Sequence, residues 1–220
     1  GAFSAYQATT GNNNTAVGDQ ALSLMTTASD NTAVGRSSLK DNTTGASSVA
    51  IGLSALENNT TASNNIAVGQ NALYTNTTGN DLVAVGCGAL YNNTSAPDNI
   101  AIGYQSQYNT TTGCQNAPMG WQPMVSNTTA SCNTAIGFES LKSNTTGDRL
   151  TAVGFCALMS NSTGVNSTAM GWCALRANTT GTGNTAFGYS VLEDTTTGNL
   201  NTGVGYRMLE ENTTGTSNSA

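Results

Sequence analysis

Five cysteines are the residues of this chain whose spacing could support covalent chemistry. Cys156 and Cys173 lie seventeen residues apart, and Cys114 and Cys132 lie eighteen apart. A disulfide needs Cα atoms within about 6 Å, so both pairs are candidates if the chain repeats at this spacing. Cys87 is then left as a free thiol or an intermolecular link. Disulfides would indicate an oxidising, extracellular location. The alternative is that the cysteines are small buried thiols.

A row of asparagines forms acceptor sequences for N-glycosylation, because a Thr or Ser follows each of them two residues later. Asparagine is equally typical of tight turns, and stacked asparagine side chains can hydrogen-bond in a ladder. The sequence leaves both interpretations open, a decorated glycoprotein and a bare ladder. The nine candidates are Asn42, Asn59, Asn76, Asn93, Asn127, Asn144, Asn161, Asn178 and Asn212.

Aromatic residues form a second row, also spaced by seventeen residues. Aromatic rings could stack on sugars, contact a neighbouring filament, or simply stack on one another and stabilise the protein. The sequence does not decide among these three roles. The row consists of Tyr104, Trp121, Phe138, Phe155, Trp172, Tyr189 and Tyr206, and a shorter row precedes it at Tyr74, Tyr91 and Tyr108.

The sequence contains no recognisable catalytic set, and we predict that the chain is not an enzyme and binds no cofactor. Histidine is absent, which removes the commonest general base and metal ligand. The acidic residues do not form the glycine-aspartate repeats of a calcium-binding solenoid, so we expect no metal site. The formal charge of −6 argues against nucleic acid as a partner. No apolar run approaches the roughly 20 residues needed to insert in a membrane.

The elements that must position these side chains repeat every seventeen residues, since glycine recurs at this spacing from Gly1 to Gly205. We number each repeat from this glycine as position 1. Position 17 is always apolar, as in Val34, and position 16 is Ala in almost every repeat, as in Ala33. Position 5 is Leu in ten repeats, as in Leu39.

A strict period without insertions predicts identical stacked units. β-Branched residues before a glycine, with Asn-Thr-Thr-Gly nearby, are typical of short strands joined by tight turns. We therefore predict an all-β protein, a parallel β-solenoid of thirteen 17-residue rungs. The glycines should lie where the chain turns a corner or adopts a positive φ.

Adjacent apolar residues raise the question of what covers the strands. Successive strand residues face opposite ways, yet Ala33 and Val34 are both apolar, as are Ala21 and Leu22. A strand that is apolar on both faces is usually covered on both, which would require a second chain on the outside. The alternative is a corner that turns both side chains inward.

The repeat around Gly120 departs from the pattern. Pro118 replaces the strand alanine, Pro123 replaces the alanine at position 4, and Gln107 and Met124 stand where leucine is expected. Because proline cannot donate a ladder hydrogen bond, we expect the sheet to be interrupted or bent here.

The unit Asn31-Thr32-Ala33-Val34-Gly35, followed by Ser38-Leu39 and Asn42-Thr43-Thr44-Gly45, resembles the head repeats of trimeric autotransporter adhesins. It is also similar to repeats of phage and bacterial tail-fibre-like proteins. The resemblance covers essentially the whole chain. It implies a left-handed parallel β-roll, usually trimeric, displayed at a cell or virion surface and used for attachment.

We expect residues 1–220 to form a single repeat array, a window of a longer fibrous chain. The predicted function is that of a structural or adhesive extracellular fibre or filament subunit, located in a cell-surface appendage or virion fibre. Its predicted partner is itself, as a homo-oligomer such as a trimer or as a helical filament, with surface glycans as a further candidate. The alternatives are a carbohydrate- or receptor-binding adhesin that uses the aromatic row, and an ice-binding protein that uses its threonine rows.

Overall fold

The computed structural model describes all residues from Gly1 to Ala220. The protein is all-β, with twelve strands of three residues each and no helix. The chain divides into two compact units, Gly1–Thr112 and Gly113–Ala220. Each unit is a parallel β-solenoid built from 17-residue coils, as predicted.

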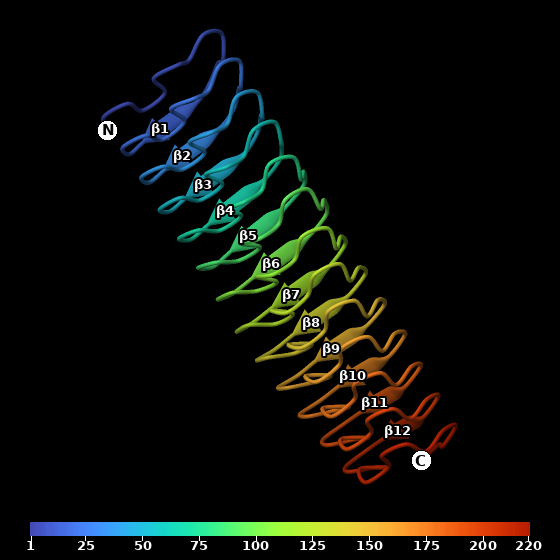
Figure 1. The fold of residues 1–220 in the computed structure, drawn as a ribbon. Helices are drawn as coiled ribbons and strands as arrows, with labels where there is room; N and C mark the ends of the chain where they lie inside the picture. The colour runs from blue at the N-terminus through green and yellow to red at the C-terminus, as the bar shows by residue number, and fades with distance from the viewer. The chain divides into compact units, whose positions relative to one another are not determined.

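In the first unit each strand pairs in parallel with the strand that follows it in the chain. Residues one period apart face each other, as Ala33 and Ala50 do. The strands therefore lie side by side at the same place in successive coils (Figure 1). They are β1 (Thr15–Val17), β2 (Thr32–Val34), β3 (Val49–Ile51), β4 (Ile66–Val68), β5 (Val83–Val85) and β6 (Ile100–Ile102).

The second unit repeats this arrangement with the same register. Its strands are β7 (Ala117–Met119), β8 (Thr134–Ile136), β9 (Thr151–Val153), β10 (Thr168–Met170), β11 (Thr185–Phe187) and β12 (Thr202–Val204). The thirteenth predicted rung contributes no strand, and only an isolated parallel bridge joins Thr202 to Ser219.

The interior of each coil is thin and is filled by small and medium apolar side chains. In the strands, position 16 points inward and position 17 outward, so Ala50 is fully buried whereas Ile51 is 41% exposed. At positions 4 and 5 both neighbours point inward, and Ala55 and Leu56 are fully buried. At positions 4 and 5 a corner therefore turns both side chains inward. At positions 16 and 17 the two side chains point to opposite faces, and the outer one is exposed in the single chain.

A left-handed backbone conformation at position 5 allows two adjacent side chains to turn inward together. Leu39 has a φ of 47° and Leu56 a φ of 51°. This conformation costs a non-glycine residue about 1–2 kcal/mol. Hydrogen bonds to the next coil offset that cost, since Leu39 N donates to Ala55 O at 3.0 Å. The sequence predicts positive φ at the glycines, and these leucines adopt it as well.

The glycine at position 1 is required for two independent reasons. Gly35 has a φ of 131°, a conformation that L side chains rarely adopt. A Cβ on Gly35 would also lie 2.4 Å from the carbonyl oxygen of Gly52 in the next coil. The positive φ predicted for this corner is confirmed, and the close approach of successive coils explains why no other residue occurs there.

Buried asparagines at position 8 satisfy polar backbone groups inside each coil. Asn59 Nδ2 donates to Asn42 Oδ1 at 2.9 Å and to Ala62 O at 3.0 Å. Asn161 does the same in the second unit, toward Asn144 Oδ1 and Gly164 O. Buried amide groups must be hydrogen-bonded to be tolerated, and these asparagines meet that requirement by forming a hydrogen-bonded ladder from coil to coil.

Position 14 carries a second set of buried asparagines, which was not predicted from the sequence. Asn31 Nδ2 donates to Gly45 O at 2.9 Å, and Asn31 Oδ1 accepts a hydrogen bond from Ser48 N at 3.0 Å. Asn133 makes the same contacts in the second unit, with Gly147 O and Leu150 N. Each such asparagine therefore joins its own coil to the next one.

Pro118 lies within β7 and does not interrupt its pairing with β8, where it faces Ala135. The expected break is therefore wrong on this side. The reason is the direction of the N–H group at position 16, which points to the preceding coil, as Ala220 N does in donating to Thr202 O. Proline consequently removes no donor from the ladder toward β8, and Ala117 N still donates to Asn133 O at 2.8 Å.

The other irregular residues lie in the interior. Met124 and Pro123 are buried in the second unit, where they replace Leu and Ala. Gln107 is fully buried in the first unit, at the position that leucine occupies in other coils. Its Nε2 donates to Asn99 Oδ1 at 3.3 Å, whereas its Oε1 has no hydrogen-bond partner.

Candidate interaction surface

The outer face of the first unit's strands is aliphatic at two positions. Position 17 was predicted to be apolar throughout. Position 15 is also aliphatic in four successive repeats, where it changes from Thr to Val49, Ile66, Val83 and Ile100. Ile66 is 41% exposed and Ile100 is 46% exposed. This switch in residue type was visible in the sequence but was not recognised as a surface feature.

The second unit has threonine at position 15 of most strands and instead exposes apolar side chains at positions 17 and 2, on either side of the glycine. We call these exposed side chains the aromatic stripe. Six of the seven residues of the predicted aromatic row belong to it, and Tyr104 lies in the first unit. The stripe consists of Met119, Trp121, Ile136, Phe138, Phe155, Met170, Trp172, Phe187, Tyr189, Val204 and Tyr206.

The rings of the stripe stack face to face along the coils. The ring centroids of Phe138 and Phe155 are 5.0 Å apart, and those of Phe155 and Trp172 are 4.1 Å apart, with interplanar angles of 7° and 8°. Tyr189 and Tyr206 stack in the same way at 5.2 Å. Both faces of Phe155 are therefore covered by its neighbours. The surface presents ring edges, whereas a sugar that stacks on an aromatic side chain needs an open ring face.

The shorter tyrosine row forms a similar stack at position 6 of the first unit. The centroids of Tyr74 and Tyr91 are 5.1 Å apart, and those of Tyr91 and Tyr108 are 4.8 Å apart. Burial raises the pKa of Tyr91, and the neighbouring phenols Tyr108 and Tyr74 add to this rise. Tyr91 is therefore a neutral phenol at physiological pH.

The glycosylation candidates lie almost entirely inside the coils. Eight of the nine asparagines have no exposed surface, and only Asn212 is partly exposed. The amide nitrogen that would carry a glycan instead donates hydrogen bonds inside the coil, as Asn76 Nδ2 does to Gly79 O at 3.0 Å. A glycan at any of the eight would have to displace these bonds and break the stacking, so this fold disfavours decoration there. The eight are Asn42, Asn59, Asn76, Asn93, Asn127, Asn144, Asn161 and Asn178.

The five cysteines are free thiols in this structure. Cys156 and Cys173 occupy position 3 of successive coils and are almost completely buried. Burial raises the pKa of both thiols, and the nearby Cys173 raises that of Cys156 further. The register thus brings this predicted pair together, and its disulfide stays a prediction that non-reducing peptide mapping tests.

The other predicted pair is arranged differently. Cys114 Sγ lies 3.8 Å from Ser131 Oγ, whereas Cys132 Sγ donates to Gln115 Oε1 at 3.4 Å. The two sulfur atoms therefore contact different side chains, each one period away along its own row. A disulfide between Cys114 and Cys132 would require both side chains to leave these contacts. Cys87 is exposed.

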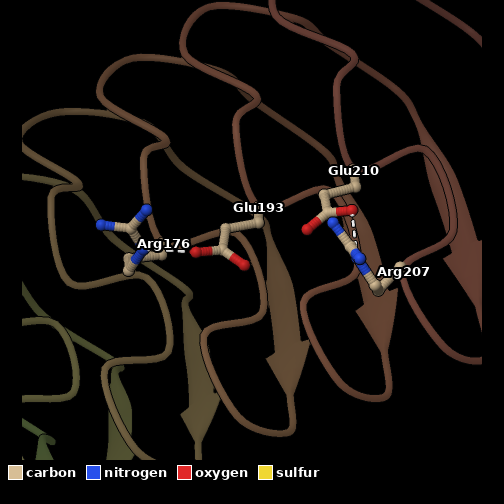
Figure 2. A network of polar contacts seen from close by, with 4 residues as sticks. All are labelled: Arg176, Glu193, Arg207 and Glu210. Atoms are coloured by element: carbon tan, nitrogen blue, oxygen red, sulfur yellow. Dashed lines mark hydrogen bonds and ion pairs between the residues drawn. The ribbon is translucent and has the colours of Figure 1, made fainter.

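Charged side chains of the second unit form local ion pairs. Arg176 Nε donates to Glu193 Oε1 at 2.7 Å across two coils, and Arg207 pairs with Glu210 (Figure 2). Burial raises the pKa of the Glu193 carboxyl, but hydrogen bonds from Ser190 and Arg176 and the charges of Arg176 and Arg207 outweigh this and lower it. The negative charge of each of these glutamates is thus balanced by an arginine of the same unit.

Neither unit contains a pocket or a group of three or more cysteine and carboxylate side chains that could hold a metal ion. The structure also has no helical segment with the length and hydropathy of a membrane span. The surfaces with a distinctive composition are therefore the aliphatic side chains at positions 15 and 17 of the first unit and the aromatic stripe of the second unit.

A scan against protein-family models finds no match to this chain, and searches of curated proteins and of solved structures find no significant similarity.

Proposed function

We propose that this chain is a structural subunit of an extracellular fibre, such as a cell-surface appendage or virion fibre, and that it acts through its side faces and self-association. The observation that supports this proposal most is the alignment of exposed apolar side chains into columns that run from coil to coil. Large exposed apolar patches typically mark contact surfaces. The repeat's resemblance to autotransporter heads and tail fibres adds a homo-oligomer, such as a trimer, or a helical filament as the expected assembly.

The test is to measure the mass and shape of the purified chain together. Light scattering coupled to size-exclusion chromatography should give a mass of several chains, and negative-stain microscopy should show elongated particles. The mass of a single chain at every concentration would contradict self-association. Particles that remain compact would contradict a fibre.

Adhesion to glycans is the second candidate, and the ring geometry gives it less support. Because Phe155 is covered on both faces, only the end rings of a stack could offer a face to a sugar. Binding on a glycan array that disappears when Trp172 is replaced by alanine would favour this candidate over a purely structural role.

Ice binding has the least support. The threonines at position 10, such as Thr44 and Thr146, are exposed. Those at position 9 use their hydroxyls inside the stack, as Thr43 Oγ1 does in donating to Thr60 O at 3.0 Å. The exposed hydroxyls at these two positions therefore form a single file. Thermal hysteresis in solutions of the chain would reverse this ranking.

A further inference from the structure

We infer that the aromatic stripe of the second unit is the surface on which a second copy of this chain docks. This inference rests on the proposed self-association and deepens it by assigning the contact to one face. The area of the stripe, its lack of charge, and the residues at the same coil positions in the first unit support it.

The area of the stripe is large enough for a stable interface. Its eleven side chains are between 37% and 69% exposed. At about 200 Å² for a large apolar side chain, they present on the order of 1,000 Å² of apolar surface. The largest apolar patch on a typical monomer is about 300–600 Å², and a standard interface buries about 800 Å² on each partner. The stripe exceeds the first value and is sufficient for the second.

The charge distribution favours a second copy of the same chain as the partner. The chain carries a formal charge of −6, so two copies repel each other unless their contact avoids charged groups. No charged residue occurs at positions 17 and 2 of the second unit. The ion pairs Arg176–Glu193 and Arg207–Glu210 lie at positions 3 and 6. A contact through the stripe therefore buries no unpaired charge, which is what a desolvated interface core requires.

The first unit shows that the fold itself does not need aromatic residues at position 2. The same coil position holds Asp19, Arg36, Leu53 and Gln70 there. The stacked rings of the second unit are therefore not a condition for coil stacking. Their exposed edges and the apolar side chains at position 17 provide the broad apolar surface that an interface uses.

The first experiment uses the natural chain without any substitution. Its two tryptophans, Trp121 and Trp172, both belong to the stripe and are 49% and 48% exposed in the single chain. Dilution from the assembled to the dissociated state, followed by sedimentation, should shift tryptophan emission to the red and increase acrylamide quenching. If the mass falls on dilution and neither signal changes, the stripe is not the interface.

The second experiment compares matched variants by sedimentation velocity. Phe155→Gln and Trp172→Arg introduce residues that the first unit already holds at this position. Each should weaken self-association by about 30-fold or more, as expected for a large side chain at an interface centre. Leu53→Gln provides the matched control at position 2 of the first unit, and Ile66→Thr provides it at position 15. Both control variants should associate like the natural chain.

The outcomes separate this inference from the proposed function. Loss of association in the controls but not in the stripe variants would assign the contact to the first unit and overturn the inference, while self-association itself would stand. A natural chain that stays monomeric at all concentrations would overturn both. Circular dichroism and melting temperature confirm that each variant is folded, and the tryptophan experiment decides the question if a variant is not.

Discussion

The two units have the same backbone and the same kind of interior but different outer faces. The first unit exposes aliphatic side chains at positions 15 and 17, such as Ile66 and Ile51. The second has threonine at position 15 of most strands and exposes aromatic side chains at position 2, such as Trp172. The comparison shows that outward positions of a solenoid coil can change in chemistry while the stacking stays the same. Inward positions are fixed by close packing, whereas the outward side chains vary.

If the two units have the same backbone, adding a side chain at position 1 should destabilise both of them. Gly35→Ala and Gly154→Ala should each destabilise the protein by more than about 4 kcal/mol or prevent folding, because the added Cβ would meet a backbone carbonyl at 2.4 Å or 2.2 Å. Urea unfolding followed by circular dichroism measures the effect. Gly183→Asn is the control, since asparagine stands at the same position at Asn64 and Asn166, and it should change stability little.

Because the two units have the same kind of interior, the asparagine ladder should contribute equally to the free energy of unfolding in both. Asn76→Ala and Asn161→Ala should each destabilise the protein by about 3 kcal/mol, because each removes several buried hydrogen bonds and leaves their partners unsatisfied. Hydrogen exchange of amides in the adjacent coils locates the loss. A variant that loses less than half as much as the other would show that the two ladders are not equivalent.

Gln107 marks a difference within the interior of the first unit. Gln107→Leu should stabilise the protein by about 2 kcal/mol, because it replaces a buried amide whose Oε1 has no partner with the residue that fills this position elsewhere. Leu90→Gln, one coil earlier, is the reverse change and should be destabilising. Thermal unfolding of the two variants checks both signs, and a destabilised Gln107→Leu would mean that this amide is needed.

Thr195 interrupts the asparagine ladder of the second unit. Asn178 Oδ1 is buried and has no hydrogen-bond partner, since the next residue of its row is Thr195 instead of asparagine. Thr195→Asn should stabilise the unit by about 1 kcal/mol, the net value of a typical hydrogen bond. Thr195→Val fills the site without a donor and should not stabilise it. Equal melting temperatures for the two variants would argue against a new hydrogen bond to Asn178 Oδ1 in Thr195→Asn.

The ion pairs of the second unit should have the smallest effect. The pKa of Glu193 is lower in the folded chain than in the unfolded chain, so its contribution is present above the unfolded pKa and is lost as pH falls through the folded pKa. Because Arg176 is partly exposed, the contribution should stay below about 1 kcal/mol. Unfolding of the natural chain and of Glu193→Gln should differ at neutral pH and converge in acid. A difference that grows in acid would reverse the assignment.

The period together with the residue types was sufficient to predict the fold, because a register without insertions indicates identical stacked units and β-branched residues before a glycine indicate short strands. Positions 16 and 17 could be recognised as strand residues, and Gly35 as a corner with positive φ. The left-handed leucines, such as Leu39, were not predictable in this way, because leucine has no intrinsic preference for that conformation. It is adopted because the next coil supplies hydrogen bonds and apolar contacts.

The candidate surface residues could be identified from the sequence, but their roles could not. The aromatic row was visible from its spacing, but the covered faces of Phe155 became evident only from the ring geometry. Asn161 matches both a glycosylation sequon and a ladder residue, and sequence cannot separate these because both need asparagine near a turn. The aliphatic column at Ile66 was overlooked because threonine occupies that position in most repeats.

The sequence by itself determined the repeat length, the parallel stacking and the identity of the residues that share each column. Only the tertiary structure decided which columns point inward, since that depends on contacts between coils and on the positive φ at positions 3, 5 and 13, as at Ser37, Leu39 and Ser47. The same physical reason explains both results. A coil of seventeen residues is too small to bury its own side chains, and its conformation is therefore completed by its neighbours in the stack.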